Sequence, residues 1–390
     1  MNDFIFQNTT KVYFGKDQMQ YLPEEIARYG RKVLLVYGGG SIKRVGLYDK
    51  IMDLLHENAI EIVEFFGVEP NPRHTTVNKG AQLCRQEKIA VILAIGGGSV
   101  IDCSKGIAAT AVAATDDVWD LVEEKEMVWQ ALPLIAIPTM AASGSEVNAG
   151  GVISNLDKKI KRAVKSPLLR PYATFADPTN TFSVSPYQTA CGSLDIMSHI
   201  FDSAYFSNQE QMEMILHMQE TLFKTVIKYA PVAMKEPENY EARANLMWAS
   251  MWAMNGFLDS GVRQENACHI MEHEISAYYD LTHGQGMAIL LPRWLNHILD
   301  ETTAPRIYRL GRQCLGVSTD FTDMQGAKET VVALAKFCFE TLGLKSHLVE
   351  FGIGGGNFEK MAEHACADGP VNSFKPLKKE DVLAIYRACL

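Results

Sequence analysis

The sequence is poor in positive charge and in long hydrophobic runs. It has 37 lysines and arginines against 46 aspartates and glutamates, a formal net charge of −9. Nucleic acids bind to basic faces, so this balance argues against a nucleic-acid partner. The longest apolar runs, such as residues 89–95, are far too short to span a bilayer. We therefore expect neither nucleic acid nor a membrane as a partner.

The cysteines lack the spacing of a disulfide or zinc framework. The eight cysteines include no Cys-x-x-Cys pair, and several, among them Cys84 and Cys191, lie in apolar patterns. This is typical of reduced, buried thiols in a cytosolic protein. The N-terminus also lacks a basic segment followed by an apolar run, so it does not resemble a signal peptide. We expect a cytoplasmic protein.

What is present is enough apolar material for two domains. The chain has 390 residues, of which 47% are hydrophobic, and single cores rarely grow beyond about 250–300 residues. Short, continuous, β-rich runs alternate with helical patterns up to about residue 180, which is typical of buried parallel strands in a Rossmann-like α/β domain. The runs lie at residues 33–37, 61–66, 90–95 and 134–137, with an early edge strand expected at 11–15.

Helical periodicity dominates from about residue 185 onward. The predicted helical segments are 186–205, 211–230, 239–255, 265–279, 326–342 and 379–389, with further helix after Pro292. We expect the prolines to mark helix starts or stops; these are Pro178, Pro186, Pro231, Pro237 and Pro292. The predicted organisation is an α/β domain over 1–180 and an all-helical domain over 181–390, joined near 178–186.

The turn at residues 96–99 is a candidate diphosphate site. Gly96-Gly97-Gly98-Ser99 follows a predicted strand and opens a predicted helix, where glycines allow close approach and free amides attract anions. It is neither Gly-x-Gly-x-x-Gly nor a loop with a Walker lysine, so the standard Rossmann and P-loop motifs are absent. A capping box between Ser99 and Asp102 is the alternative for that pair.

A second glycine turn, Gly38-Gly39-Gly40-Ser41, follows the strand at 33–37. An acidic residue at the end of this early strand would bind the ribose hydroxyls of NAD. Here the turn has no acid and is followed by Lys43 and Arg44, which favours NADP, with NAD still possible. The alternative is that both basic side chains are simply solvent-exposed.

Two weaker candidates follow. Thr139 and Ser143 lie in a loop of small and hydroxyl residues after the strand at 134–137, suited to a nicotinamide ribose or phosphate, but such loops are common. Lys161 lies in a run of charged residues and is read most simply as part of a charged turn.

Four residues in the second half suggest a metal site. Asp195 and His199 are four residues apart, so on a helix they share a face. His269 lies in another helical pattern, and His283 follows it. One carboxylate and three imidazoles suit a borderline divalent ion and leave room for a substrate.

Together these motifs resemble the iron-containing (group III) alcohol dehydrogenase family, most closely its NADP-dependent butanol dehydrogenase and aldehyde reductase branch. The motifs are Gly-Gly-Gly-Ser-x-x-Asp at 96–102, Pro-Thr-x-x-x-Ser-Gly-Ser-Glu at 138–146, Asp-Pro at 177–178, Asp-x-x-x-His at 195–199, His-x-x-x-His at 269–273 and His-Gly-x-Gly at 283–286. The resemblance covers essentially the whole chain and implies a dehydroquinate synthase-like fold and a homodimer.

The resemblance also implies roles for individual residues. The metal ligands would be Asp195, His199, His269 and His283, and the ion they hold would be Fe²⁺ or Zn²⁺. The catalytic residues would be His273, beside the substrate, and Asp102. The nicotinamide nucleotide would contact Gly38, Gly39, Gly40, Ser41, Lys43, Gly96, Gly97, Gly98, Ser99, Asp102, Thr139, Ser143 and Lys161.

The predicted activity is hydride transfer between NADP(H) and small aliphatic aldehydes or primary alcohols such as butanal and butanol. The metal would act as a Lewis acid, and His273 would supply a proton. The alternative for His273 is a packing or supporting role. Rival functions are a glycerol dehydrogenase-like enzyme, a cyclase related to dehydroquinate synthase, and a non-enzymatic nucleotide- or metal-binding protein. A zinc hydrolase is disfavoured, because position 277 is alanine and breaks a His-Glu-x-x-His motif that would start at His273.

Overall fold

The computed structural model describes residues 2–207 and 209–390. These residues form two compact units. The N-terminal unit comprises residues 7–184, and the C-terminal unit comprises residues 185–390 together with the N-terminal segment up to Phe6. In the C-terminal unit, the backbone amide of Asn2 donates to the carbonyl of Gly261, and the Phe6 ring packs edge-on against Phe257.

The N-terminal unit is built on a parallel sheet. Its strands, in spatial order, are β1 (Lys11–Phe14), β8 (Ala173–Ala176), β5 (Leu134–Pro138), β4 (Val91–Gly96), β2 (Lys32–Tyr37) and β3 (Glu61–Phe66). Every neighbouring pair runs parallel. The Rossmann-like α/β prediction is therefore confirmed, including β1 at the sheet edge.

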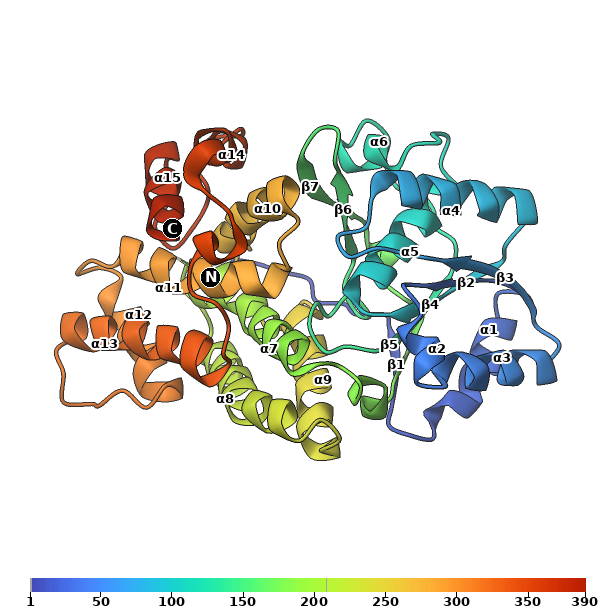
Figure 1. Ribbon diagram of the computed structural model, residues 1–390, viewed down its shortest axis with the longest axis horizontal. Coiled ribbons are helices and arrows are strands. Elements are labelled where there is room, and N and C mark those ends of the chain that lie inside the picture. The colour runs from blue at the N-terminus through green and yellow to red at the C-terminus, as the bar shows by residue number, and fades with distance from the viewer. Residues whose placement is uncertain (1, 208) are drawn as a thin grey trace. The chain divides into compact units, whose positions relative to one another are not determined.

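Helices cover both faces of this sheet (Figure 1). On one face lie α1 (Leu22–Ala27), α2 (Ser41–Arg44) and α3 (Leu47–Glu57), and on the other lie α4 (His74–Glu87), α5 (Gly98–Thr110) and α6 (Val118–Val122). Successive residues of β2 enter opposite cores: Val33 and Leu35 pack with α1–α3, whereas Leu34 and Val36 pack with α4–α6. Burial on both faces is the reason that these strands read as continuous hydrophobic runs.

The sequence patterns missed part of this unit. An antiparallel hairpin of β6 (Gly150–Asn155) and β7 (Ile160–Lys165) follows β5, and β8 was also not predicted. The hairpin strands carry glycines and charged residues, and β8 has only four residues, so none shows a convincing apolar run. Short 3₁₀ turns complete the unit at Gln18–Tyr21, Pro167–Leu169 and Pro178–Thr181.

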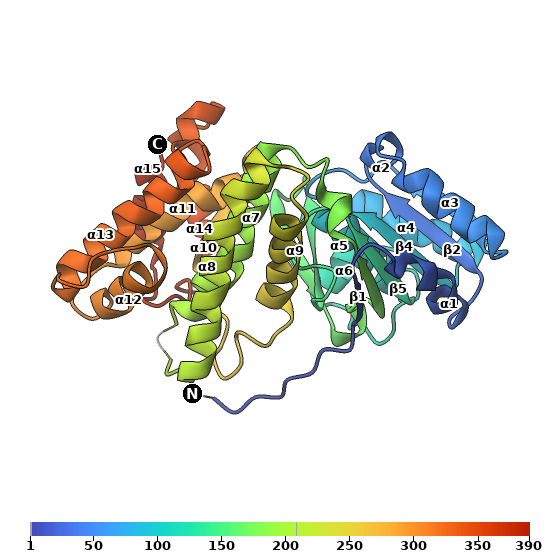
Figure 2. The same ribbon diagram turned by 90° about the horizontal axis from the view of Figure 1, so that it is seen from below.

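The C-terminal unit is helical, as predicted (Figure 2). Its helices are α7 (Pro186–Ile200), α8 (Glu213–Lys235), α9 (Tyr240–Met254), α10 (Ala267–Tyr279), α11 (His283–Ile298), α12 (Ala304–Cys314), α13 (Asp323–Lys336), α14 (Phe358–Ala365) and α15 (Lys379–Ala388). The π-helical turns Phe201–Tyr205 and Phe337–Thr341 prolong α7 and α13, and 3₁₀ turns lie at Leu348–Phe351 and Gly355–Asn357. Helix α7 contacts α8, α9 and α11 and is central to the packing.

The prolines behave in two ways. Pro178 and Pro186 begin helical segments, preceded by Asp177 and Ser185, whose side chains cap the first turn. The prediction that Pro231 and Pro292 start or stop helices is wrong, because Pro231 lies inside α8 and Pro292 inside α11. A proline costs one backbone hydrogen bond and crowds the preceding turn. Pro292 is buried together with Leu290 and Leu291, and Pro231 is flanked by the buried Ala230 and Ala233, so packing on these helices outweighs the local penalty.

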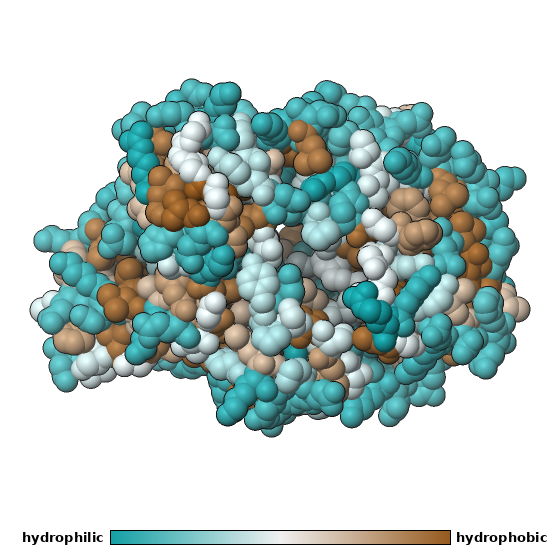
Figure 3. All heavy atoms as spheres, viewed as in Figure 1, coloured by the Kyte–Doolittle hydropathy of each residue, from teal (hydrophilic) through white to brown (hydrophobic). Residues whose placement is uncertain are grey.

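On the face shown in Figure 3, hydrophilic side chains cover most of the periphery and hydrophobic ones lie in separate patches. None of the helices formed by residues 2–207 and 209–390 is both long and apolar enough to cross a membrane. All eight cysteines are free thiols, and burial raises the pKa of Cys84 and of Cys191 to about 12.

Candidate active site

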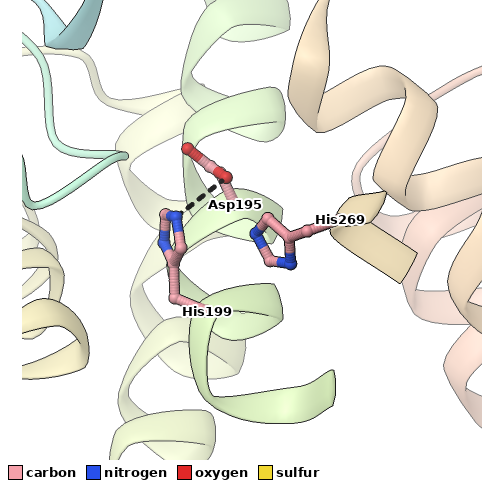
Figure 4. A group of neighbouring side chains, drawn as sticks. All are labelled: Asp195, His199 and His269. Atoms are coloured by element: carbon pink, nitrogen blue, oxygen red, sulfur yellow. Dashed lines mark ion pairs between the residues drawn. The ribbon is translucent and has the colours of Figure 1, made fainter. Parts of the chain in front are cut away.

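Helix α7 presents the first two predicted ligands. Asp195 and His199 lie one helical turn apart and project from the same side of the helix, with His199 Nε2 3.7 Å from Asp195 Oδ1 (Figure 4). The capping Ser185 and Pro186 at the first position fix the start of this helix. The predicted spacing therefore produces a shared face.

The other two histidines reach the same place from different helices. His269 extends from α10 toward Asp195 and His199, as Figure 4 shows, with its ring 5.0 Å from that of His199. His283 is the first residue of α11, and its Nε2 lies 3.4 Å from Asp195 Oδ1. The rings of His269 and His283 are 5.3 Å apart. All four predicted metal ligands thus converge within the C-terminal unit.

A buried carboxylate orients His269. Asp202, in the π-helical turn after α7, accepts a hydrogen bond from His269 Nδ1 at 2.9 Å and another from the His269 backbone amide at 3.0 Å. Its side chain is fully buried. With Nδ1 occupied as a donor, Nε2 of His269 is left with its lone pair available to a metal ion.

Glu272 does the same for His283. Its Oε2 is in hydrogen-bond contact with His283 Nδ1, and its Oε1 accepts from the Ser276 hydroxyl at 2.5 Å. Sequence reasoning missed Asp202 and Glu272. A signal existed, since each lies three residues after a predicted ligand, His199 and His269, on the same helical face. Nothing in the sequence distinguishes that spacing from an ordinary surface pair.

Two glycines make room for this arrangement. A Cβ on Gly284 would lie 2.1 Å from the Cys191 carbonyl oxygen, so α11 can meet the backbone of α7 only because residue 284 has no side chain. A Cβ on Gly286 would lie 2.8 Å from Glu272 Cγ. The His-Gly-x-Gly motif therefore places His283 beside Asp195 and leaves space for its carboxylate partner.

The electrostatics of the cluster suit a cation. Burial lowers the pKa of His199 to about 4 and so keeps this imidazole neutral. Burial alone would lower the pKa of His269 as well, but the nearby Asp202 carboxylate gives a net rise. Within the described chain, His199 Nδ1 and His269 Nε2 are buried without a hydrogen-bond partner. Three imidazoles and a carboxylate with such nitrogens fit a borderline divalent metal ion.

His273 borders the cluster without joining its centre. It lies one turn after His269 on α10 and is partly exposed, with its ring 5.8 Å from that of His283. His273, Glu272 and His283 also offer donor atoms within 4.8 Å of one another. Because Glu272 is already bound to His283 and Ser276, this second group reads as the outer part of the same site.

In the N-terminal unit, the three predicted nucleotide turns meet at one edge of the sheet. They follow β2, β4 and β5, which are adjacent, and strands that run parallel end at the same edge. Residues Gly38 and Gly96 both face Val100 at the start of α5. The amide of Thr139 donates to the Gly96 carbonyl at 3.0 Å. The glycine turns and the Thr139 loop therefore lie together at the edge of the sheet where a nicotinamide nucleotide is expected.

Close packing joins the turn at 97–99 to the Ser143 loop. A Cβ on Gly98 would lie 2.3 Å from Ser143 Oγ. Helix α5 begins at Gly98 with Gly97 as its cap residue, so Ser99 already lies inside the helix and the alternative of a Ser99–Asp102 capping box is not realised. The four residues at 96–99 thus form a strand-to-helix turn, as predicted.

Asp102 braces the same loop. Its Oδ1 accepts from the Ser145 hydroxyl at 2.5 Å and its Oδ2 from the Val152 amide at 3.0 Å. One turn later, the ammonium of buried Lys105 donates to the Asn148 side chain at 2.6 Å and to the Gly150 carbonyl at 2.8 Å. Burial raises the pKa of Asp102, although Lys105 opposes the shift. These contacts connect Asp102 to the 143–152 loop, and its expected catalytic and nucleotide-binding roles stay predictions.

The two remaining basic candidates lie in different settings. Lys161 belongs to β7 and is buried, and the hairpin turn is residues 156–159, so its interpretation as part of a charged turn is wrong. Lys43 lies on α2 and is half-exposed, in line with the alternative that this basic side chain simply faces solvent. Its ammonium, however, lies over the Tyr48 ring and near Glu64. Neither position by itself assigns a nucleotide contact.

Comparison with known proteins agrees with both units. Residues 9–178 match the model for iron-containing alcohol dehydrogenase, and residues 189–390 match that for the C-terminal part of the same family. The chain belongs to the iron-containing alcohol dehydrogenase family. It is an NAD(P)-dependent alcohol dehydrogenase, an oxidoreductase with a nicotinamide cofactor and a metal ion, and the non-enzymatic alternative is set aside.

Individual relatives cover nearly the whole length of this dehydrogenase. It is 45% identical over 389 residues to NADH-dependent butanol dehydrogenase A of Clostridium acetobutylicum, covering 99% of each chain. It is 35% identical to the NADPH-dependent aldehyde reductase YqhD of Escherichia coli, covering 93% of this chain and 94% of the other. The solved structure of NADH-dependent butanol dehydrogenase A from Thermotoga maritima aligns with a TM-score of 0.94 at 33% identity. The alignment covers 100% of this chain and 99% of the other.

The buried carboxylate of Glu146 in the N-terminal unit predicts that the stability of the protein depends on pH. Burial raises the pKa of Glu146 from its ordinary 4.5 to about 7, against the opposing charge of Lys105, and Asp102 adds to the rise. The folded state then binds this proton more tightly than the unfolded state, so its contribution to stability is lost as the pH rises from about 4.5 to about 7. At 1.36 kcal/mol per pKa unit, the loss is on the order of 3 kcal/mol.

Glu146→Gln is therefore expected to stabilise the protein at pH 8 relative to wild type, with little effect at pH 4.5. Calorimetric melting of both proteins at the two pH values would measure this. Glu57→Gln, which removes an exposed carboxylate at the end of α3, is the matched control. An unchanged pH dependence in Glu146→Gln would show that the buried carboxylate carries no such cost.

Proposed function

We propose that this enzyme reduces small aliphatic aldehydes such as butanal to primary alcohols, with NADPH as donor and Fe²⁺ or Zn²⁺ in the metal site. The observation that carries the proposal is the convergence of Asp195, His199, His269 and His283 from α7, α10 and α11. The overall reaction converts the aldehyde, NADPH and one proton into the alcohol and NADP⁺. A reverse oxidation of the alcohol uses the same groups.

The chain's own residues would hold and complete this chemistry. When bound, the metal supplies Lewis acidity toward the carbonyl oxygen and the nicotinamide supplies the hydride. Asp202 and Glu272 would keep Nε2 of His269 and of His283 directed at the metal. Gly96 to Ser99, with the helix α5 amides behind them, would bind the diphosphate. Thr139 and Ser143 would contact the nicotinamide half, and Lys161 would add positive charge.

His273 would supply the proton to the product oxygen, directly or through one water molecule. His273→Ala is expected to lower kcat about 10²-fold, within the usual range for loss of a general acid, while bound metal stays near one ion per chain. Elemental analysis with steady-state kinetics would measure both. His217→Ala, on the exposed face of α8, is the matched control. Loss of metal in His273→Ala would instead make His273 a ligand or a structural residue.

Turnover tests the function directly. Metal-loaded protein is given butanal with NADPH and, in parallel, with NADH, and absorbance is followed at 340 nm. A rate of NADPH oxidation well above the rate of NADH oxidation supports the full proposal. A faster rate with NADH overturns only the choice of cofactor. No turnover of butanal with either, but turnover of glycerol with NAD(P)⁺, would favour the polyol alternative.

We further propose a cytoplasmic homodimer that uses the edge of β1. Strand β1 is the outermost strand of the sheet and pairs with β8 on one side, and outermost strands are the usual place for pairing with a second copy. The eight free thiols suit a reducing compartment. Light scattering after gel filtration would give the mass in solution, and a monomer would overturn the proposal.

A further inference from the structure

Glu64 brings a negative charge close to a turn whose own sequence has none. Strand β3, which carries Glu64, is the neighbour of β2, which ends in the Gly38–Ser41 turn. The Glu64 carboxylate accepts hydrogen bonds on both oxygens, from the Tyr37 hydroxyl at 2.5 Å and from the Tyr48 hydroxyl at 3.0 Å. Its position is therefore defined by two tyrosines, one on β2 and one on α3.

The same group holds Lys43. The Lys43 ammonium lies 3.9 Å from Glu64 Oε2, 4.2 Å from the centre of the Tyr48 ring and 5.1 Å from that of Tyr37. Carboxylate and aromatic faces both attract a cation, so three groups favour this one position. The Lys43 side chain is 49% exposed and that of Glu64 is 36% exposed, so a ligand at the surface can reach both.

We propose that Glu64 is a specificity-determining residue of the nucleotide site, which sets the preference between nucleotides with and without a 2′-phosphate through its hold on Lys43. This inference rests on the proposed NADPH-dependent function and on the expectation, drawn from the sequence, that the adenosine ribose binds at the Gly38–Ser41 turn. A 2′-phosphate must draw Lys43 away from Glu64 and approach the Glu64 charge, whereas a free 2′-hydroxyl does neither. Glu64 therefore weakens the NADPH preference that Lys43 alone would create.

Removal of the Glu64 charge should strengthen binding of the 2′-phosphate only. In Glu64→Gln, the dissociation constant of NADPH is expected to fall roughly threefold to fivefold, the effect of one exposed ion pair, with that of NADH unchanged. Lys43→Met should raise the dissociation constant of NADPH by a similar factor. In the double variant, the Glu64 change should have much less effect than it has alone, because its partner is gone.

The test is a fluorescence titration of the metal-loaded enzyme and these variants with NADPH and NADH, repeated with adenosine 2′,5′-bisphosphate and 5′-AMP as competitors. The matched control is Glu61→Gln, which removes one charge from the other end of β3, where Glu61 pairs with Lys32 at 2.7 Å. Equal effects of Glu64→Gln on both nucleotides would indicate a structural role, and an equal effect of Glu61→Gln would indicate net charge alone. Either result overturns the inference.

Failure of the proposed function gives a different result. If wild-type enzyme binds neither nucleotide, the site itself is misplaced, and the inference falls with it. If wild type binds both and Glu64→Gln leaves their ratio unchanged, the function stands and only the role of Glu64 is wrong. Tyr48→Phe removes one hydroxyl from Glu64 but keeps the ion pair, so it should leave the ratio close to that of wild type.

Discussion

Asp195→Asn is expected to lose its metal and at least about 10³-fold in turnover. This side chain is the only carboxylate among the four converging ligands, its Oδ1 lies 3.4 Å from His283 Nε2 and 3.7 Å from His199 Nε2, and it is nearly isosteric with the amide. Loss of one preorganised group at the reacting oxygen already costs about 10²–10³-fold, and this variant would lose the ion itself. Elemental analysis, chelator competition and steady-state kinetics measure the effect.

A graded series separates ligation from support. Asp202→Asn keeps the four ligands, but its side-chain amide has one acceptor oxygen, whereas the backbone amide and Nδ1 of His269 both donate to Asp202. Because His269 is then held less well, we expect metal affinity to fall about 10- to 100-fold. Glu220→Gln is the control for loss of a buried carboxylate in the same unit, because Glu220 binds Tyr205 and Arg309 rather than a predicted ligand. Full metal content and activity in Asp195→Asn would exclude it as a ligand.

Gly284→Ala is expected to destabilise the C-terminal unit by about 3 kcal/mol, at the upper end for overpacking. The added Cβ would lie 2.1 Å from the Cys191 carbonyl oxygen and 2.6 Å from its carbonyl carbon, both backbone atoms of α7. The strain can be relieved only if α11 moves away from α7, which carries His283 away from Asp195. Melting temperature and metal affinity should therefore fall together.

Gly354→Ala is the matched control for this change. A Cβ on Gly354 would enter open space, with no neighbouring segment within 4 Å, and the residue has a negative φ of −105°. Its replacement should therefore leave stability and metal binding near those of wild type. If Gly284→Ala also melted like wild type and bound metal normally, the close approach of α7 and α11 would not be required for the site.

Local pattern predicted the elements whose burial is uniform. Strands β2 and β4 are covered on both faces, so nearly every residue is apolar and the run is plain in the sequence. Helix α7 has a serine cap and an N-terminal proline, both readable signals. The β6–β7 hairpin was missed because its strands mix glycine and charge. Pro292 was misread because the packing of α11, rather than its local propensity, decides whether that helix continues.

The candidate site divides in the same way. Asp195, His199, His269 and His283 were found because their residue types and spacing are unusual, and the structure brings them together. Asp202 and Glu272 escaped notice, because a carboxylate three residues after a histidine is ordinary until its partner is known. Glu64 was invisible for a stronger reason: its relation to the Gly38–Ser41 turn exists only through the pairing of β2 with β3.

By itself, the sequence determined the fold class, the family and the residue types of the site, because these depend on hydrophobic periodicity and on motifs short enough to read along the chain. Only the tertiary structure decided which carboxylates orient the histidines, why Gly284 is required and which acid faces Lys43. Those properties depend on contacts between segments far apart in sequence, for which no local pattern carries information.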